Sequence, residues 1–103
     1  MVDEILTAAG VLHKQARFVR LPDETHAVWF DDVSADGPDG YNRIFTHDVT
    51  VELYAPKPDP KTEEAIEAEL NARGLPWEKQ AAYWLTDAQR YQTIYEFSYI
   101  TKN

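Results

Sequence analysis

Residues 43–54, RIFTHDVTVELY, alternate between two kinds of side chain over a stretch long enough to cross a small domain. One parity is mostly apolar and consists of Phe45, His47, Val49, Val51 and Leu53. The other parity consists of Ile44, Thr46, Asp48, Thr50, Glu52 and Tyr54. Successive side chains of a β-strand point to opposite faces of the sheet, so this pattern is typical of a half-buried strand. We predict that it is the central strand of a sheet.

Six further segments should supply the strands that pair with that strand or extend its sheet, and the helices that pack on the sheet. Residues 91–101 repeat the alternation with aromatic side chains, and residues 26–33 and 77–86 are rich in strand-forming residues. Residues 11–20 fit a strand or extended arm better than a helix. Residues 2–9 and 61–73 fit helices. The order helix, strand, strand, strand, helix, strand, strand predicts a single α+β domain spanning residues 1–103. We expect a two-layer sandwich, with a mainly antiparallel sheet of four to five strands and both helices on one face.

Local signals mark the ends of both predicted helices. Asp59 precedes Pro60, which is the arrangement expected of an N-cap followed by proline in the first helical turn. Gly74 and Gly10 stand where each helix should stop. Ile66 and Leu70 lie one turn apart and should be buried, whereas the acidic residues 63–69 of the same helix fit a solvated face. In residues 2–9, Ile5 and Leu6 are the expected buried anchors.

The chain carries a strong negative charge, which narrows the choice of partners. Its 103 residues include 18 Asp and Glu against 10 Lys and Arg, for a formal net charge of -8. Nucleic acids and anionic membranes are therefore poor partners, because both attract basic surfaces. There is no cysteine, and no apolar run approaches the roughly 20 residues that span a bilayer. The N-terminus also lacks the pattern of a signal peptide, so we expect a cytoplasmic protein.

Two possible metal sites have weak support in the sequence. His13, His26 and His47 fall on different segments with no short ligand spacing, which favours structural roles. Asp31, Asp32, Asp36 and Asp39 suggest a calcium loop, but Arg43 occupies the position where such a loop needs glutamate. The connector at residues 34–40, SADGPDG, is better interpreted as an exposed hairpin tip. We predict no metal and no cofactor.

The sequence also lacks the common signatures of catalysis. It contains no nucleophile elbow, no phosphate-binding loop and no dinucleotide fingerprint, and a thiol nucleophile is excluded. We therefore predict that the protein is not an enzyme. A small enzyme with a site built from loops stays open as an alternative, with Asp31, Asp32, Asp36 and His47 as the available groups.

The aromatic content favours an interface. Three Trp and six Tyr residues are more than a core of this size easily hides, and such side chains suit protein interfaces. Filling of the layer between sheet and helices is the alternative. Tyr54 and Trp84, out of parity with the core face of their strands, are the aromatic interface candidates. Asp36, Gly37 and Asp39 in the predicted tip complete the candidate set.

The order of these segments resembles the tail-completion proteins of long-tailed bacteriophages and prophages, also described as tail terminator or head-tail joining proteins. The resemblance covers nearly the whole chain and rests on four places. A short helix leads to a strand ending Ala16, Arg17, Phe18, followed by a proline and HAVWFDD. After the Asp/Gly-rich tip come THDVTVELYAPKPDP and the acidic helix TEEAIEAEL. The closing hairpin carries Tyr91, Gln92, Tyr95, Glu96 and Phe97.

The resemblance implies a structural protein of virion assembly. It implies a homo-oligomeric ring, commonly of six subunits, at the head-proximal end of the tail tube, where it stops tail polymerisation and contacts the head connector. The expected partners are other copies of the chain, the tail tube protein and the head connector protein. The expected location is the bacterial host cytoplasm during assembly and then the virion tail. A small acidic binding or inhibitor module, without enzymatic activity, is the alternative.

Overall fold

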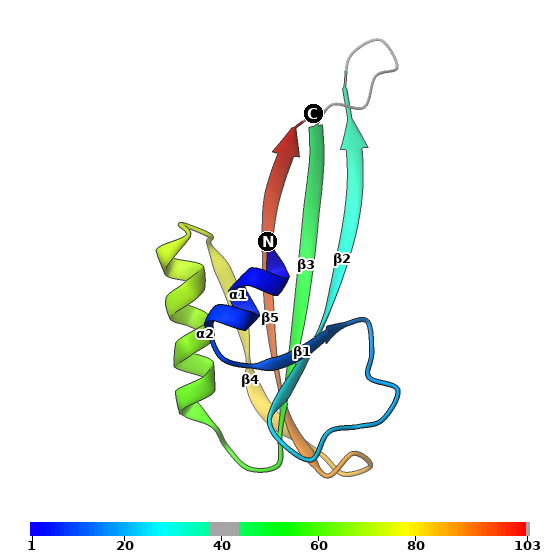
Figure 1. The fold of residues 1–103 in the computed structure, drawn as a ribbon, viewed down its shortest axis with the longest axis vertical. Coiled ribbons are helices and arrows are strands. Elements are labelled where there is room, and N and C mark those ends of the chain that lie inside the picture. The colour runs from blue at the N-terminus through cyan, green and yellow to red at the C-terminus, as the bar shows by residue number, and fades with distance from the viewer. Residues whose placement is uncertain (38–43, 103) are drawn as a thin grey trace.

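The structure is a computed structural model that describes residues 1–37 and 44–102, and it contains two helices and a five-stranded sheet (Figure 1). The elements follow the predicted order, and the strand order in the sheet is β1-β2-β3-β5-β4. The α+β sandwich predicted from the sequence is therefore confirmed. The sheet is mixed, because β1 pairs with β2 in parallel whereas the other three pairings are antiparallel.

Strand β3, Ile44–Ala55, is the central strand that the alternation predicted. It pairs along its length with β2, His26–Asp36, on one side and with β5, Arg90–Lys102, on the other. Val49, Val51 and Leu53 are each 2% exposed, and Phe45 and His47 on the same parity are half-buried. The apolar parity therefore faces the core, as expected for a pleated strand with one covered face.

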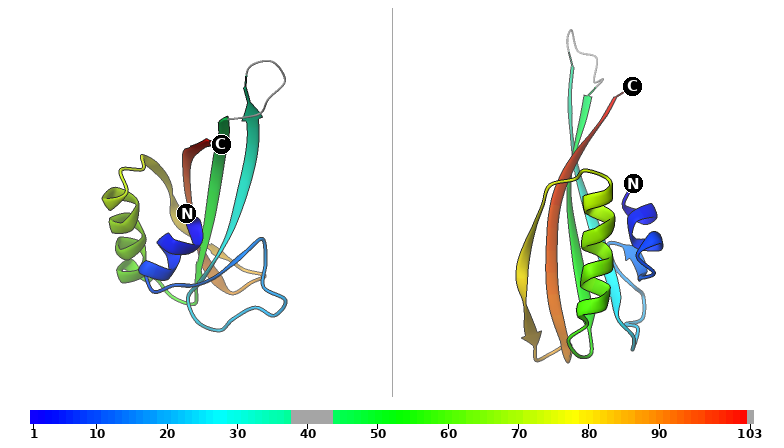
Figure 2. Two further views of the ribbon diagram at one scale, coloured as in Figure 1. Left: turned by 45° about the horizontal axis from the view of Figure 1, so that its top comes forward. Right: turned by 90° about the vertical axis from the view of Figure 1, so that its left-hand side faces the viewer.

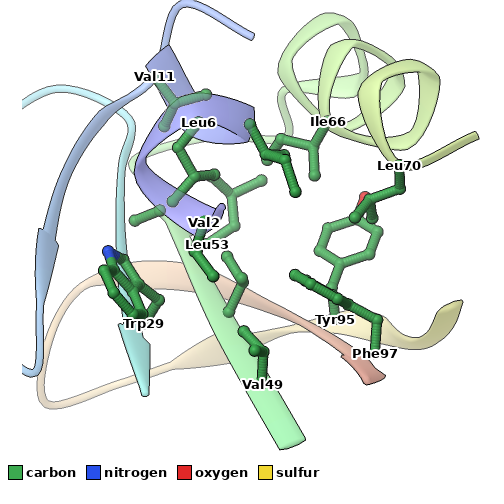
Figure 3. Packing of buried hydrophobic residues seen from close by; sticks show 13 residues of the cluster. Val2, Leu6, Val11, Trp29, Val49, Leu53, Ile66, Leu70, Tyr95 and Phe97 are labelled. Atoms are coloured by element: carbon green, nitrogen blue, oxygen red, sulfur yellow. The ribbon is translucent and has the colours of Figure 1, made fainter. Parts of the chain in front are cut away.

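Both helices, α1 at Val2–Ala8 and α2 at Pro60–Ala72, pack on this apolar face of the sheet. Figure 2 shows them side by side. Figure 3 shows Val2 and Leu6 of α1 and Ile66 and Leu70 of α2 converging on side chains of the sheet. The buried cluster consists of Val2, Ile5, Leu6, Val11, Ala27, Trp29, Val49, Val51, Leu53, Ile66, Leu70, Tyr95 and Phe97.

The helix ends follow from the capping residues that the sequence predicted. The Asp59 side chain accepts hydrogen bonds from the backbone N–H and the hydroxyl of Thr62, at 3.2 and 2.7 Å, and so caps α2. Each helix stops at a glycine with positive φ, Gly10 at +77° and Gly74 at +67°. The residue after each glycine, Val11 or Leu75, donates its N–H back into the last turn of its helix. This closure satisfies carbonyls that would otherwise lack partners.

Strand β1 is shorter than the extended segment predicted at residues 11–20. It covers only Leu12–Gln15 and pairs with the start of β2. Ala16 ends it with a φ of +69°, which turns the chain out of the strand. The following loop, residues 16–25, then folds over the start of β2, where the Phe18 ring packs against His26 at 5.3 Å.

Strand β4, Trp77–Leu85, pairs with β5 across a turn at residues 86–89, so Arg90 belongs to β5 and not to the turn. Its register shifts between Gln80 and Tyr83, which marks a β-bulge. A bulge places an extra residue on one strand and so reverses the face on which later side chains lie.

The sheet extends well past the helices, and the molecule measures 50 × 28 × 21 Å. β1 pairs with β2 only as far as Trp29, and β4 pairs with β5 only as far as Phe97. Beyond these points β2, β3 and β5 continue as a three-stranded arm, which is visible at the top of Figure 1. We define the arm as residues 30–36, 44–48 and 98–102. Neither of the helices described within residues 1–37 and 44–102 is long and apolar enough to cross a membrane.

Candidate protein interface

The arm has two strand edges without a neighbour among the described residues. β2 pairs only with β3 over residues 30–36, and β5 pairs only with β3 over residues 98–102. The two strands with open edges flank the same part of β3, because Asp36 of β2 and Lys102 of β5 both pair with Ile44. An open strand edge offers backbone donors and acceptors that can pair with another chain. The arm is therefore a candidate interface on geometric grounds.

Apolar side chains on the arm support the same interpretation. Val33 is 48% exposed on the face that carries the helices, and Ile100 is 60% exposed on the opposite face, which we call the open face. Phe30 and Ile44 are also exposed on the open face. Exposed apolar side chains gathered on one projecting element are typical of interaction sites.

A polar network joins the three strands of the arm. The Asp31 carboxylate accepts a hydrogen bond of 2.8 Å from His47 Nδ1, and His47 Nε2 lies 2.9 Å from the Thr101 hydroxyl. The His47 ring also stacks on Tyr99 at 4.3 Å. Burial raises the pKa of the Tyr99 hydroxyl, and the charge of Asp31 adds to the effect.

This network has the connectivity of an acid, a base and a hydroxyl nucleophile, which bears on the enzyme alternative. However, neither of the two hollows described below includes any of its residues, and the side chains of Asp31 and His47 are each only 15% exposed. We assign it a structural role, because each contact joins one strand to its neighbour.

The open face is acidic where the arm begins. Asp32 lies directly opposite Asp48, and Glu96 lies directly opposite Glu78. None of these four carboxylates forms an ion pair within residues 1–37 and 44–102. Asp48 accepts a hydrogen bond from Ser98, and Glu96 accepts one from Gln80, but these neutral donors do not cancel the charges. Like charges in direct cross-strand pairs destabilise a sheet, so two such pairs suggest a role in binding.

A hollow of about 630 Å³ lies beside this acidic cluster, where β4 starts and β5 loses its neighbour. Its walls include the carboxylates of Asp48, Glu78 and Glu96. The remaining lining residues are Val49, Thr50, Pro76, Trp77, Phe97 and Ser98. The hollow thus combines negative charge, apolar surface and an open strand edge.

The predicted tip lies only partly within the described residues. Asp36 ends β2 and is exposed, and its carboxylate accepts a hydrogen bond of 2.8 Å from the N–H of Gly37. Residues 34–36 belong to the strand, so the prediction that the tip begins at Ser34 was wrong. Asp39 and Arg43 lie outside the described residues. The interface roles of Asp36, Gly37 and Asp39 stay predictions.

Tyr54 lies on the open face, out of parity with the core as the sequence indicated. Its ring stacks on His26 at 5.5 Å, and its hydroxyl donates to Glu52 and accepts from Gln92. Burial and the bond to Glu52 raise the pKa of Tyr54 to about 12. Since these contacts leave Tyr54 half-buried within one chain, it contributes less free surface than we expected.

Trp84 lies on the face that carries the helices, which the alternation of β4 did not indicate. It is opposite Tyr91 in the register, and the two rings meet edge to face at 4.9 Å. The bulge before Tyr83 causes the change of face. Trp84 is nevertheless 41% exposed, because it lies beyond the buried cluster, so it remains available to a partner.

A second hollow, of about 340 Å³, lies at the other end of the open face. It is lined by Ala16, Arg17, Phe18, Leu21, His26, Val28, Glu52, Tyr54, Leu85 and Ala88. Arg90 holds the loop in place through a 3.1 Å bond to the carbonyl of Pro22. The hollow forms where the loop after β1 meets the turn after β4.

The three histidines lie apart. His13 contacts the Val11 carbonyl and Asp3, His26 is buried beneath Phe18, and His47 belongs to the arm. Asp31 and Asp32 point to opposite faces of β2, so the aspartates proposed for a calcium loop do not converge there. Within residues 1–37 and 44–102, no group of three acidic or imidazole side chains is placed to hold a metal ion.

The acidic face of α2 is less solvated than the sequence indicated. Lys79 of β4 lies 2.8 Å from both Glu63 and Glu67, and the hydroxyl of the fully buried Tyr95 donates to Glu67 at 2.6 Å. Burial alone would raise the pKa of Glu67, but the bonds from Lys79 and Tyr95 hold it below its usual value. The spacing of four residues between Glu63 and Glu67 was the available signal, since it places both on one face of the helix.

No protein-family model matches the chain, and a search of curated proteins found no significant match.

Proposed function

We propose that this chain is a structural assembly protein of a bacteriophage or prophage tail. It works as a ring of copies that caps the tail tube and joins it to the head connector. A head-to-tail contact between identical subunits closes into a ring when its rotation divides the full circle. The resemblance to tail-completion proteins implies a ring of six copies. It acts in the cytoplasm of the bacterial host and then stays in the virion tail.

The arm is the observation that carries this proposal. It projects past both helices, leaves two strand edges open and exposes Val33 and Ile100 on opposite faces. A surface of this kind suits pairing with other protein chains better than it suits binding of a small substrate. The strong negative charge further favours protein partners over nucleic acid.

Deletion of the gene from a phage or inducible prophage that carries it tests the proposal. We expect lysates without infectious particles, in which electron microscopy shows separate heads and tails, or tails of irregular length. Normal particles from the deletion strain would contradict the proposal.

Complementation with variants connects this test to the arm. Val33→Lys and Ile100→Lys place charge on the two faces of the arm and should restore few infectious particles. Ala8→Lys, on an exposed position of α1, is the matched control and should restore many. Circular dichroism should confirm that all three variants are folded.

The acidic open face favours a second candidate, a binding or inhibitor module that caps a basic protein. Asp32, Asp48, Glu78 and Glu96 would supply the complementary charge. Affinity purification from the host separates the two candidates. Recovery of tail tube or connector proteins supports the assembly function, and recovery of basic nucleases or other DNA-binding proteins alone supports the module.

A further inference from the structure

The two edges of the sheet carry opposite charges. The acidic hollow lies at the β4–β5 edge, as described above. At the other edge, β1 and the start of the following loop form residues 12–21, LHKQARFVRL, which include Lys14, Arg17 and Arg20 but no Asp or Glu. These three cations form no ion pair within the described parts of the chain. Within the described parts of the chain, the β1 edge thus presents three cations outside any ion pair, with Asp23 and Glu24 later in the same loop, and the β4–β5 edge presents carboxylates outside any ion pair.

The apolar surfaces of the two edges also correspond. Val19 is 92% exposed and Leu21 is 51% exposed, and Leu12 at the start of β1 is exposed as well. The hollow offers Pro76 beside its carboxylates, whereas the side chain of Trp77 lies on the face that carries the helices and packs against Tyr95. Apolar contacts surrounded by paired charges are the usual composition of a specific protein interface.

We infer that residues 12–21 of one copy dock into the hollow at the β4–β5 edge of the next copy. Arg17 and Arg20 then approach Glu78, Glu96 and Asp48, and Val19 covers the apolar part of the hollow. This inference rests on the proposed ring and assigns the surfaces through which its subunits meet.

The direction of the contact agrees with ring closure. The donor segment and the acceptor hollow lie at opposite edges of one sheet, so each copy can donate to one neighbour and accept from the other. Such a heterologous contact generates rings, whereas a contact between identical patches stops at a dimer. Cations supplied by a neighbour also relieve the repulsion within the pairs Asp32–Asp48 and Glu78–Glu96.

Cysteine cross-linking in a tandem protein tests the contact directly. The chain has no cysteine, so any introduced pair is unique. Two complete copies are joined by a flexible Gly/Ser linker long enough to reach across the 50 Å long axis, with Ser98→Cys in one copy and Val19→Cys in the other. The linker keeps the local concentration of the partner high even if separate chains are monomeric.

We expect a short bis-maleimide to join Val19→Cys to Ser98→Cys at least about tenfold faster than a control pair, which corresponds to about 1.4 kcal/mol of preferred contact. The control places the acceptor cysteine at the exposed position Glu64 of α2, as Glu64→Cys. Both test positions are exposed, so the fold should tolerate them. Equal rates for the test and control pairs would overturn the inference.

Reversal of the charges on both sides of the contact provides a control for misfolding, because a second substitution does not restore cross-linking to a copy that has merely unfolded. Arg17→Glu with Arg20→Glu in the donor copy should slow cross-linking about tenfold, because like charges then face each other. Glu78→Lys with Glu96→Lys in the acceptor copy should restore it. Failure of the second exchange to restore the rate would also overturn the inference.

The outcomes separate this inference from the proposed function. If the deletion phage shows the assembly defect and the cross-link is absent, the subunits meet through other surfaces and the tail function stands. If the cross-link forms and the deletion phage assembles normally, the chain associates with itself but the tail function falls.

Discussion

Strand β3 runs through two environments that differ in almost every respect except backbone pairing. In the half covered by helices, Val49, Val51 and Leu53 are each 2% exposed and pack against α1 and α2. In the arm, Phe45 and His47 on the same face of the strand are only half-buried. Both halves pair with β2 and β5 through one continuous register. Hydrogen bonds alone therefore do not distinguish them, and the stability of the fold should depend mainly on the covered half.

The covered half and the arm also have different roles. The covered half contains the side chains that make a stable monomer possible. The arm contains exposed apolar groups, two open edges and the start of the acidic cluster, and we expect these features to add little to the stability of the monomer. A surface that adds little to the stability of the monomer, but whose conformation is fixed by the rest of the fold, is suited to partner binding.

Truncation of a core side chain should have the largest effect. Leu70 is 0% exposed between α2 and the sheet, so Leu70→Ala removes buried methyl groups and leaves a cavity. We expect a loss of about 2–5 kcal/mol in the free energy of unfolding. Urea denaturation followed by tryptophan fluorescence measures it. A loss no larger than that of an equivalent truncation in the arm, Ile100→Ala, would remove the distinction between the halves.

Removal of the Tyr95 hydroxyl should have an intermediate effect. Tyr95→Phe keeps the buried ring but deletes the 2.6 Å hydrogen bond to Glu67. We expect a loss of about 1.5–3 kcal/mol, since the acceptor is charged. The same denaturation assay applies, with Tyr91→Phe as the control, because Tyr91 lies on the same strand at a half-buried position. Equal losses for the two variants would show that the bond contributes nothing specific.

Acid should weaken the same contact. The pKa of Glu67 is lower in the folded chain than its usual value, so its ion pair stabilises the fold fully above the unfolded pKa of about 4.3. That stabilisation is lost as the pH falls through the lower pKa of the folded state. We expect the free energy of unfolding to fall less between pH 6 and about pH 3 for Glu67→Gln than for the natural chain.

Glu64→Gln is the control for this acid effect, because Glu64 is an exposed neighbour on the same helix. It should keep the pH dependence of the natural chain. If Glu67→Gln and Glu64→Gln respond alike to acid, the contact with Lys79 and Tyr95 does not govern the acid response.

A substitution in the arm should have the smallest effect on stability. Ile100→Ser replaces a side chain that is 60% exposed, and we expect a change within about 0.5 kcal/mol. The same variant should reduce self-association, measured by analytical ultracentrifugation or by incorporation into tails. A large loss of stability with unchanged assembly would reverse the roles assigned to the two halves.

The sequence by itself determined the elements and most of the core. Alternation identified β3 and β5, Asp59 and Gly74 bounded α2, and the face to which Val49 and Leu53 point followed from parity. These features are local, because periodicity and capping depend on residues only a few positions apart. For the same reason, the sequence indicated that Tyr54 lies opposite the core.

Only the tertiary structure decided the features that depend on distant pairing. Trp84 changed face because of a bulge that the alternation of β4 does not reveal, and Ala16 ended β1 early. Glu67 and Lys79 met because α2 crosses next to β4, and Asp32 and Asp48 became neighbours through register. The open edges of the arm exist because β1 and β4 stop short of β2 and β5. Relative strand length and register are set by contacts across the whole fold, so no local pattern contains them.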